Sequence, residues 1–277
     1  CDYIHDDLPA CKHTLSFVYE HNMKFADAFA HEMECQATAK KVQLYVYDEA
    51  GTFLSARTIE GEELKTNRIQ LDLEPGTYRL LAWAGLNETD YDWTKPEKGS
   101  LLKDFRVAVK HERQTVGREL LGLFQGEMTL DISEGGETHT RFPLVKNTNK
   151  LRFVLIDTHS GTALDASDFS VSVTTTNSDL SHDNQPIADT RFTWQPYYQG
   201  VKEVASADGT TSYPAVCAEL NTLRLINGTK GHLKLCYSKE ETSFFDVDLT
   251  DFLCLTQMES HKLSAQEYLD RQDEYVI

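Results

Sequence analysis

The residues of this 277-residue chain that most directly suggest covalent chemistry are its six cysteines. Cys1 is followed by a polar, acidic stretch, residues 2–7. A cysteine at this position predicts the product of the bacterial lipoprotein signal peptidase, which carries lipid on the thiol and the amine. Two or more acyl chains hold a protein stably in a bilayer. We therefore expect residues 1–10 to be a lipid-anchored tether; a cysteine found there by chance is the alternative.

Cys11 and Cys35 flank one apolar segment, and we expect them to form a disulfide. A loop of this length would stabilise the fold by about 3–4 kcal/mol in the chain-entropy model. Two unrelated buried thiols are the alternative. Cys236 and Cys254 lie in strand-like segments and are expected to be packed thiols; Cys217 is left without an assigned partner. The cysteines and histidines do not show zinc-site spacing.

Two groups of aromatic residues could contact a sugar or a partner protein. Trp93 lies near Tyr91, and Trp194 lies near Tyr197 and Tyr198, in segments expected to be loops. Loops carry binding residues more often than the elements that they connect. The alternative is that each group closes the end of its own β-sandwich.

The sequence contains no recognisable catalytic motif. GxSxG, HExxH, P-loop and GxGxxG patterns are absent, so we expect neither an enzyme nor a cofactor or metal site. The net charge of −17 argues against nucleic acid as a partner, because a phosphate backbone attracts basic surfaces. No apolar run approaches the roughly 20 residues of a membrane-spanning helix.

Short strands separated by turns dominate the pattern. Val42, Leu44 and Val46 alternate with polar or aromatic residues, as in a strand with one buried face. Pro75-Gly76 and Asn227-Gly228 are turn dipeptides, and each predicts a hairpin between the strands on either side. Leu249 is assigned to the strand that contains Phe245 and Val247.

Ser264 and Glu267 form a capping-box pattern, which predicts one short helix near the C-terminus. Many short strands with glycine-marked turns favour an all-β fold of two β-sandwiches in series. The polar segment 147–149 is the expected junction, which divides the chain into domains 1–146 and 147–277.

An ordered series of segments along nearly the whole chain resembles one protein family. The segments are Cys1-Asp2-Tyr3, residues 15–19 and 22–29, residues 44–48, residues 73–78 with Ala82-Trp83, residues 144–150, residues 220–225 and residues 266–275. Together they are similar to the fimbrillin-associated anchor proteins of Bacteroidales, the FimB-like minor anchor subunits of fimbriae. Each segment alone is only a strand or a turn, and the order of the series carries the resemblance.

The resemblance implies two tandem transthyretin-like (Greek-key) β-sandwich domains and no enzyme activity. It implies an outer-membrane lipoprotein, exposed at the cell surface, that anchors a fimbrium (pilus). The implied partner is the fimbrial shaft subunit, fimbrillin, which would dock by adding a β-strand to an exposed sheet edge. The alternatives are a surface glycan-binding lipoprotein and a fimbrial tip adhesin of the same superfamily.

Overall fold

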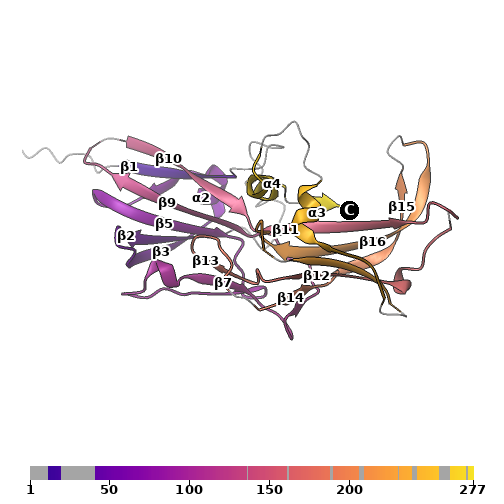
Figure 1. The fold of residues 1–277 in the computed structure, drawn as a ribbon. Coiled ribbons are helices and arrows are strands. Elements are labelled where there is room, and N and C mark those ends of the chain that lie inside the picture. Colours follow the sequence, from indigo (N-terminus) through magenta and orange to yellow (C-terminus); the bar gives the residue numbers. More distant parts are fainter. Residues whose placement is uncertain are drawn as a thin grey trace, which may run out of the picture.

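The computed structural model describes residues 12–19, 41–135, 137–160, 162–187, 190–205, 209–229, 231–238, 242–255, 263–272 and 274–277. The molecule is elongated, with the first half of the chain at one end and the second half at the other (Figure 1). The first half contains β1 (Lys12–Tyr19), β2 (Lys41–Asp48), β3 (Phe53–Glu60), α2 (Gly61–Thr66), β4 (Ile69–Leu71), β5 (Gly76–Ala84), β6 (Tyr91–Trp93), the 3-10 helix η1 (Leu102–Asp104), β7 (Arg106–Val109), β8 (Thr115–Val116), β9 (Phe124–Ile132) and β10 (Glu137–Lys146).

The second half is also mostly β-structure. It contains β11 (Thr148–Ile156), the 3-10 helix η2 (Ala166–Asp168), β12 (Phe169–Thr175), β13 (Asp179–Ser181), β14 (Phe192–Trp194), β15 (Tyr198–Ala205), β16 (Ser212–Leu223), β17 (His232–Tyr237), β18 (Thr242–Asp248), α3 (Leu249–Cys254), α4 (Ala265–Arg271) and β19 (Glu274–Val276). The expectation of a predominantly β fold is confirmed.

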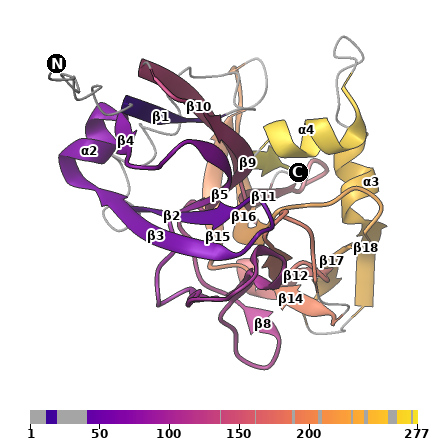
Figure 2. The same cartoon turned by 90° about the vertical axis from the view of Figure 1, so that its left-hand side faces the viewer.

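The first half is built around a seven-stranded sheet in the order β3-β2-β5-β9-β10-β1-β4. Strand β1 lies parallel to β10 along its whole length, from Lys12 opposite Glu137 to Tyr19 opposite Leu144. Viewed from this end, the sheet curls so far that it nearly closes (Figure 2). The Arg57 side chain on β3 donates a hydrogen bond to the carbonyl oxygen of Gln70 on β4, 2.7 Å away, and so links the two outer strands.

The central strands of this sheet are buried on both faces. Leu80 and Ala82 pack inside the curled sheet, whereas Leu81 and Trp83 pack on its other face. This explains why residues 80–84 form a continuous apolar run instead of alternating with polar residues. The second face belongs to a core that continues into the other half of the chain.

The second half contains two more sheets, in the orders β15-β16-β11-β19 and β18-β17-β12-β14-β8. Strands also pair across the middle of the chain, because β8 adds to β14 and β13 adds to β7. One continuous core extends from Tyr45 and Trp83 in the first half to Trp194, Leu220 and Tyr275 in the second. Asn147 alone separates β10 from β11, so the expected junction is a single buried residue between two long strands.

Both expected hairpins are wrong. Asn227-Gly228 does lie in a turn, but the chain only bends at Pro75, and Gly76 is already the first residue of β5. Strand β4 pairs with β1, while β5 pairs with β2 and β9. Strand β16 pairs with β11 and β15, while β17 pairs with β12 and β18. At each of these two positions, the chain leaves one strand and enters another that pairs with different partners. A turn dipeptide fixes the local backbone but does not determine which strands become neighbours.

The expected helix is present as α4, with the full capping box formed by Ser264 and Glu267. Two further helices, α2 and α3, were not predicted. Leu249 is not a strand residue, because Asp248 caps α3 by accepting a hydrogen bond from the backbone of Asp251. An aspartate at this position satisfies an otherwise unpaired N–H group and so begins the helix.

Candidate interaction surfaces

The proposed lipid site and disulfide lie outside the described residues. Cys1, Cys11 and Cys35 therefore keep their roles as predictions only. Cys217, Cys236 and Cys254 are free thiols. Cys236 lies in strand β17 as expected, whereas Cys254 is the last residue of helix α3 and not part of a strand. Burial, together with the charges of Asp251 and Asp248, raises the pKa of the Cys254 thiol, which makes it a weaker nucleophile.

Trp194 lies in the core. Its side chain is fully buried, and its indole N–H donates to the Thr175 hydroxyl, 2.8 Å away. A buried ring with a satisfied N–H contributes to stability and offers no face to a ligand. We therefore do not retain Trp194 as a contact residue.

Trp93 is partly exposed, but its own chain covers its ring. The Lys95 ammonium lies 2.9 Å from the ring centroid, and the indole N–H donates to the Tyr45 hydroxyl at 3.2 Å. Burial lowers the pKa of Lys95, although the nearby carboxylates of Glu88 and Asp92 oppose this shift. A sugar that stacked on Trp93 would have to displace this ammonium group.

Tyr197 and Tyr198 are also engaged by neighbouring side chains. The Tyr197 hydroxyl donates to Glu219 at 3.1 Å, and burial together with the Glu219 charge raises the pKa of Tyr197. The Lys202 ammonium lies 4.2 Å from the Tyr198 ring centroid. Both residues remain possible contacts, but each ring already has an intramolecular partner.

Glu219 is the centre of a charged cluster on β16 and β11. Its carboxylate accepts from Arg152 at 2.8 Å and lies 3.4 Å from the Lys150 ammonium. Burial raises the pKa of Glu219, but the hydrogen bond from Arg152 and the two positive charges outweigh it. The pKa therefore lies below its ordinary value of 4.5.

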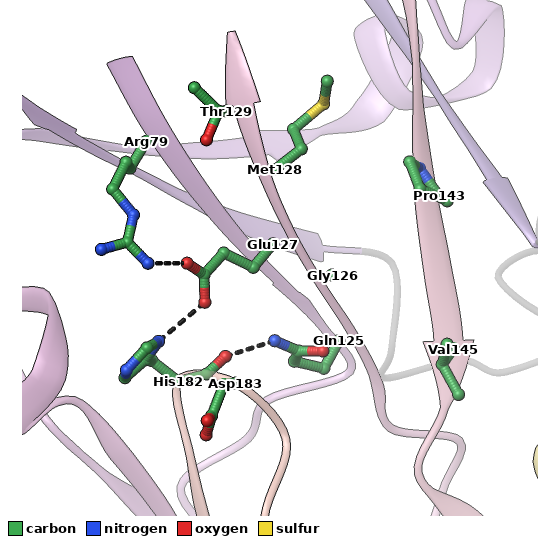
Figure 3. Close-up of a pocket in the computed structure, with 10 residues that line it drawn as sticks. All are labelled: Arg79, Gln125, Gly126, Glu127, Met128, Thr129, Pro143, Val145, His182 and Asp183. Carbon is green, nitrogen blue, oxygen red and sulfur yellow. Dashed lines mark hydrogen bonds and ion pairs between the residues drawn. The ribbon is translucent and has the colours of Figure 1, made fainter. Parts of the chain in front are cut away.

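A cavity of about 630 Å³ lies where β9 and β10 diverge (Figure 3). The two strands pair only at Gln125 with Val145 and at Phe124 with Lys146. On one wall, the Glu127 carboxylate binds the Arg79 guanidinium and, at 2.7 Å, His182 Nδ1. His182 follows β13, so this wall connects the two halves of the chain.

The close approach of β9 and β10 beside this cavity depends on a glycine. A Cβ atom added at Gly126 would lie 2.2 Å from the carbonyl oxygen of Pro143 and 2.8 Å from a Leu144 methyl. Only glycine lets the two strands approach this closely. Beyond this point both strands have an edge that the other does not pair with.

One exposed aromatic cluster was missed in the sequence. The rings of Phe169, Tyr237 and Phe244 contact one another at the surface. The signal for it is the pair Phe244-Phe245, because two adjacent aromatic residues cannot both alternate into the core of a regular strand. We refer to these three residues as the ring cluster.

Among the described residues, no three His, Cys, Asp or Glu side chains are grouped so that they could hold a metal ion. None of the helices that the structure describes has the length and apolar character needed to cross a bilayer.

Several solved structures share this fold. A proposed polysaccharide-binding protein from Bacteroides thetaiotaomicron is 31% identical, with a TM-score of 0.81 over 96% of this chain and 90% of that chain. A proposed adhesin from the same organism is 28% identical, with a TM-score of 0.84 over 98% and 91% of the two chains. The fimbrial anchor protein Mfa2 from Porphyromonas gingivalis has a TM-score of 0.67 over 96% and 88%, but at 14% identity this likeness shows the fold alone.

The β-rich architecture is thus the fold found in a fimbrial anchor protein and in proposed adhesins. The family model described as "Fimbrillin-A associated anchor proteins Mfa1 and Mfa2" matches residues 8–277, and the chain belongs to this family. Membership of this family implies a location at the cell surface and association with fimbrial subunits, in a family of anchor proteins rather than enzymes. A search of curated protein sequences gave no match.

Proposed function

We propose that this chain is an outer-membrane lipoprotein that anchors a fimbrium to the cell surface. The observation that carries the proposal is the family match, which extends over residues 8–277. In this proposal Cys1 carries the lipid, residues 1–10 form a tether, and the folded body is a spacer that docks the fimbrial shaft subunit, fimbrillin. The elongated shape supports a spacer role, because it separates the β1 end from the opposite end (Figure 1).

The spacer is proposed to consist of two tandem transthyretin-like (Greek-key) β-sandwiches, at 1–146 and 147–277. The change from β10 to β11 at the single residue Asn147 supports this boundary. The strand pairing between the halves makes them one mechanical unit rather than two freely hinged domains.

Docking is proposed to occur through an added β-strand. Two features support this mechanism. Strands β3 and β15 are both edge strands of eight residues, and β9 and β10 diverge to leave unpaired edges beside a cavity. An added strand would gain affinity from main-chain hydrogen bonds and specificity from alternate side chains. Slower amide hydrogen exchange along one of these edges when fimbriae bind would support this mechanism, and unchanged exchange at every edge would exclude it.

Deletion of the gene in the native host tests the anchor role. We expect fimbriae to be shed into the medium, and the protein to copurify with fimbriae from wild-type membranes. A Cys1→Ser variant should release both the protein and the fimbriae, while leaving the fold intact. Fimbriae of normal length that stay on cells lacking the protein would exclude an anchor.

The predicted lipid on Cys1 and the predicted disulfide between Cys11 and Cys35 need separate measurements. The intact mass of protein from the native host should show acyl chains on Cys1, and the protein should partition into detergent. Peptide mapping without reduction should join Cys11 to Cys35. An unmodified Cys1 would contradict the predicted lipid anchor, and free thiols at Cys11 and Cys35 would contradict the predicted disulfide.

A second candidate function is glycan binding at the surface, either by this lipoprotein alone or as a fimbrial tip adhesin. It is favoured by the 31% identity to a proposed polysaccharide-binding protein. Trp93, Tyr197 and Tyr198 are the contacts proposed for it. Binding on a glycan array that is lost in a Trp93→Ala variant would support it, and no binding to any glycan would count against it.

A further inference from the structure

The ring cluster is a compact surface feature made by three elements. Phe169 is the first residue of β12, Tyr237 is the last residue of β17, and Phe244 lies near the start of β18. The ring centroids are 5.6 Å apart for Phe169 and Tyr237, 6.1 Å for Phe169 and Phe244, and 4.7 Å for Tyr237 and Phe244. Tyr237 remains 45% exposed and Phe244 43% exposed, so nearly half of each of these two side chains is available to a partner.

An irregularity in the edge strand places Phe244 in the cluster. Strand β18 is the outer strand of its sheet, and its register with β17 shifts between Leu235 and Cys236. The shift leaves Phe244 without a directly opposite residue, while Phe245 stays in register and packs against the core. Bulges of this kind redirect a side chain, and they are common at sheet edges and near functional sites.

Hydrogen bonds also fix the backbone of the segments that carry the cluster. The Gln199 side-chain amide donates to the carbonyl oxygens of Ala166 and Phe169, at 2.6 and 2.8 Å. The backbone N–H of Ser238 donates to the carbonyl oxygen of Asp168 at 2.8 Å. A surface that is already ordered loses little conformational entropy when it binds a partner.

The position of the cluster suits contact with something beyond the cell surface. The adjoining ends of β12, β17 and β18 lie at the end of the molecule opposite β1 (Figure 1). If the chain is tethered through its N-terminal segment, as proposed above, this end points away from the membrane.

The geometry of the rings favours a protein side chain over a sugar. A sugar ring stacks on one open, flat aromatic face. Here the planes of neighbouring rings meet at 41°, 79° and 41°, which produces a corrugated surface with recesses between the rings. Recesses between aromatic rings are typical of the pockets that hold an anchor side chain of a protein partner.

The charges beside the cluster indicate which charges the partner should carry around its apolar side chain. Asp165 and Asp168 precede Phe169 in the 3-10 helix segment that leads into β12. They carry negative charge, in a chain with a net charge of −17. Complementary charges steer association, so basic residues are expected to flank the apolar side chain of the partner.

We propose that the ring cluster is the docking surface for an apolar segment, flanked by basic residues, of the fimbrial subunit that this protein holds. The proposal rests on the anchor function proposed above and identifies its contact surface. The partner inserts an apolar side chain between the three rings, and its basic flanks face Asp165 and Asp168.

The test measures binding to fimbriae purified from a host strain that lacks this gene. The full chain is compared with a Tyr237→Ser, Phe244→Ser double variant and with an Ile187→Ser, Leu255→Ser control. The control changes apolar side chains that are at least as exposed and that lie outside the edges proposed for strand addition. We expect the double variant to bind about tenfold more weakly or worse, because it loses two ring contacts at the centre of the interface. The control and a Tyr237→Phe variant should bind like the unmodified protein, and binding should weaken as salt is raised.

Circular dichroism and thermal unfolding verify that the variants are folded, which their surface positions lead us to expect. Equal binding by the double variant and the unmodified protein would overturn the docking surface and leave the anchor function intact. Failure of the unmodified protein to bind any fimbriae would overturn both. Glycan binding or self-association that is lost in the double variant, without any effect on fimbriae, would show that the surface has a different occupant and would also overturn the proposal.

Discussion

At the residue scale, buried polar side chains connect segments of the second half that lie far apart in the sequence. Asn147 and Asn184 exchange side-chain hydrogen bonds of 2.6 and 2.9 Å. Arg224 donates to the Asn184 carbonyl at 2.7 Å and forms two hydrogen bonds with Asp270, at 2.8 and 2.9 Å. Because each of these polar groups forms hydrogen bonds with another, removing one of them leaves a buried polar atom without a hydrogen-bond partner.

The Asp270→Ala variant should lower the free energy of unfolding by about 3 kcal/mol, because it leaves the Arg224 guanidinium nearly buried and without its counter-charge. The Arg224 and Asp270 side chains are only 12% and 10% exposed. Urea denaturation measures the effect. Glu62→Ala, which breaks the exposed pair with Lys65, is the control and should change stability by about 0.5 kcal/mol or less. Equal effects in both variants would contradict this account.

Glu219 should make stability depend on pH in acid. Its pKa in the folded protein lies below the ordinary value of 4.5, so the unfolded chain binds its proton first as pH falls. Its contribution is present above pH 4.5 and is lost as pH falls through the lowered pKa. The stability difference between the wild type and Glu219→Gln should therefore be constant near neutral pH and shrink in acid, as measured by urea denaturation across pH. A difference that grew in acid would contradict the assignment.

Whether an individual aromatic residue is buried or exposed could not be predicted from its residue type. Trp93 and Trp194 have similar neighbours in the sequence, yet one lies at the surface under Lys95 and the other in the core. The difference arises from strand pairing over long distances, since β14 is enclosed between β12 and β8. A single sequence does not contain this information in its local pattern.

At the scale of elements, local sequence patterns predicted where strands lie but not which strands pair with each other. The alternation of Val42, Leu44 and Val46 predicted β2, and the capping box at Ser264 predicted α4. Both signals depend on residues close in sequence. The two hairpins failed because the partners of β4 and β17 lie in other segments. The parallel β1–β10 pair joins residues 125 positions apart and has no local signal.

Gly126 tests the close approach of β9 and β10. A Gly126→Ala variant should lose about 1–3 kcal/mol of stability, because the added methyl collides with the Pro143 backbone and two packed side chains. Gly231→Ala is the matched control, since its Cβ would meet nothing nearer than 3.6 Å. That control should be neutral or gain up to about 1 kcal/mol from a less flexible unfolded chain. Thermal unfolding compares the two, and a neutral Gly126→Ala would show that the strands can separate.

The whole molecule should unfold as one unit. Its larger core contains Tyr45 and Trp83 from the first half and Trp194 and Leu220 from the second, and strands pair between the halves. Calorimetry should therefore show a single transition, with equal calorimetric and van't Hoff enthalpies. Residues 1–146 and 147–277, produced separately, should not fold to stable structures. Two transitions, or a stable isolated half, would indicate independent domains.

The parallel pairing of β1 with β10 has a consequence for the order of folding. A chain that emerges with its N-terminus first presents β1 long before residues 137–144 exist to receive it. Contacts between such distant residues form slowly, whereas β2 and β3 can pair at once. Pulse-labelled hydrogen exchange should show β1 protected later than β2. Strand β1 would then lack its β10 partner until about half of the chain has emerged, which leaves an interval in which a modifying enzyme can reach the N-terminal segment.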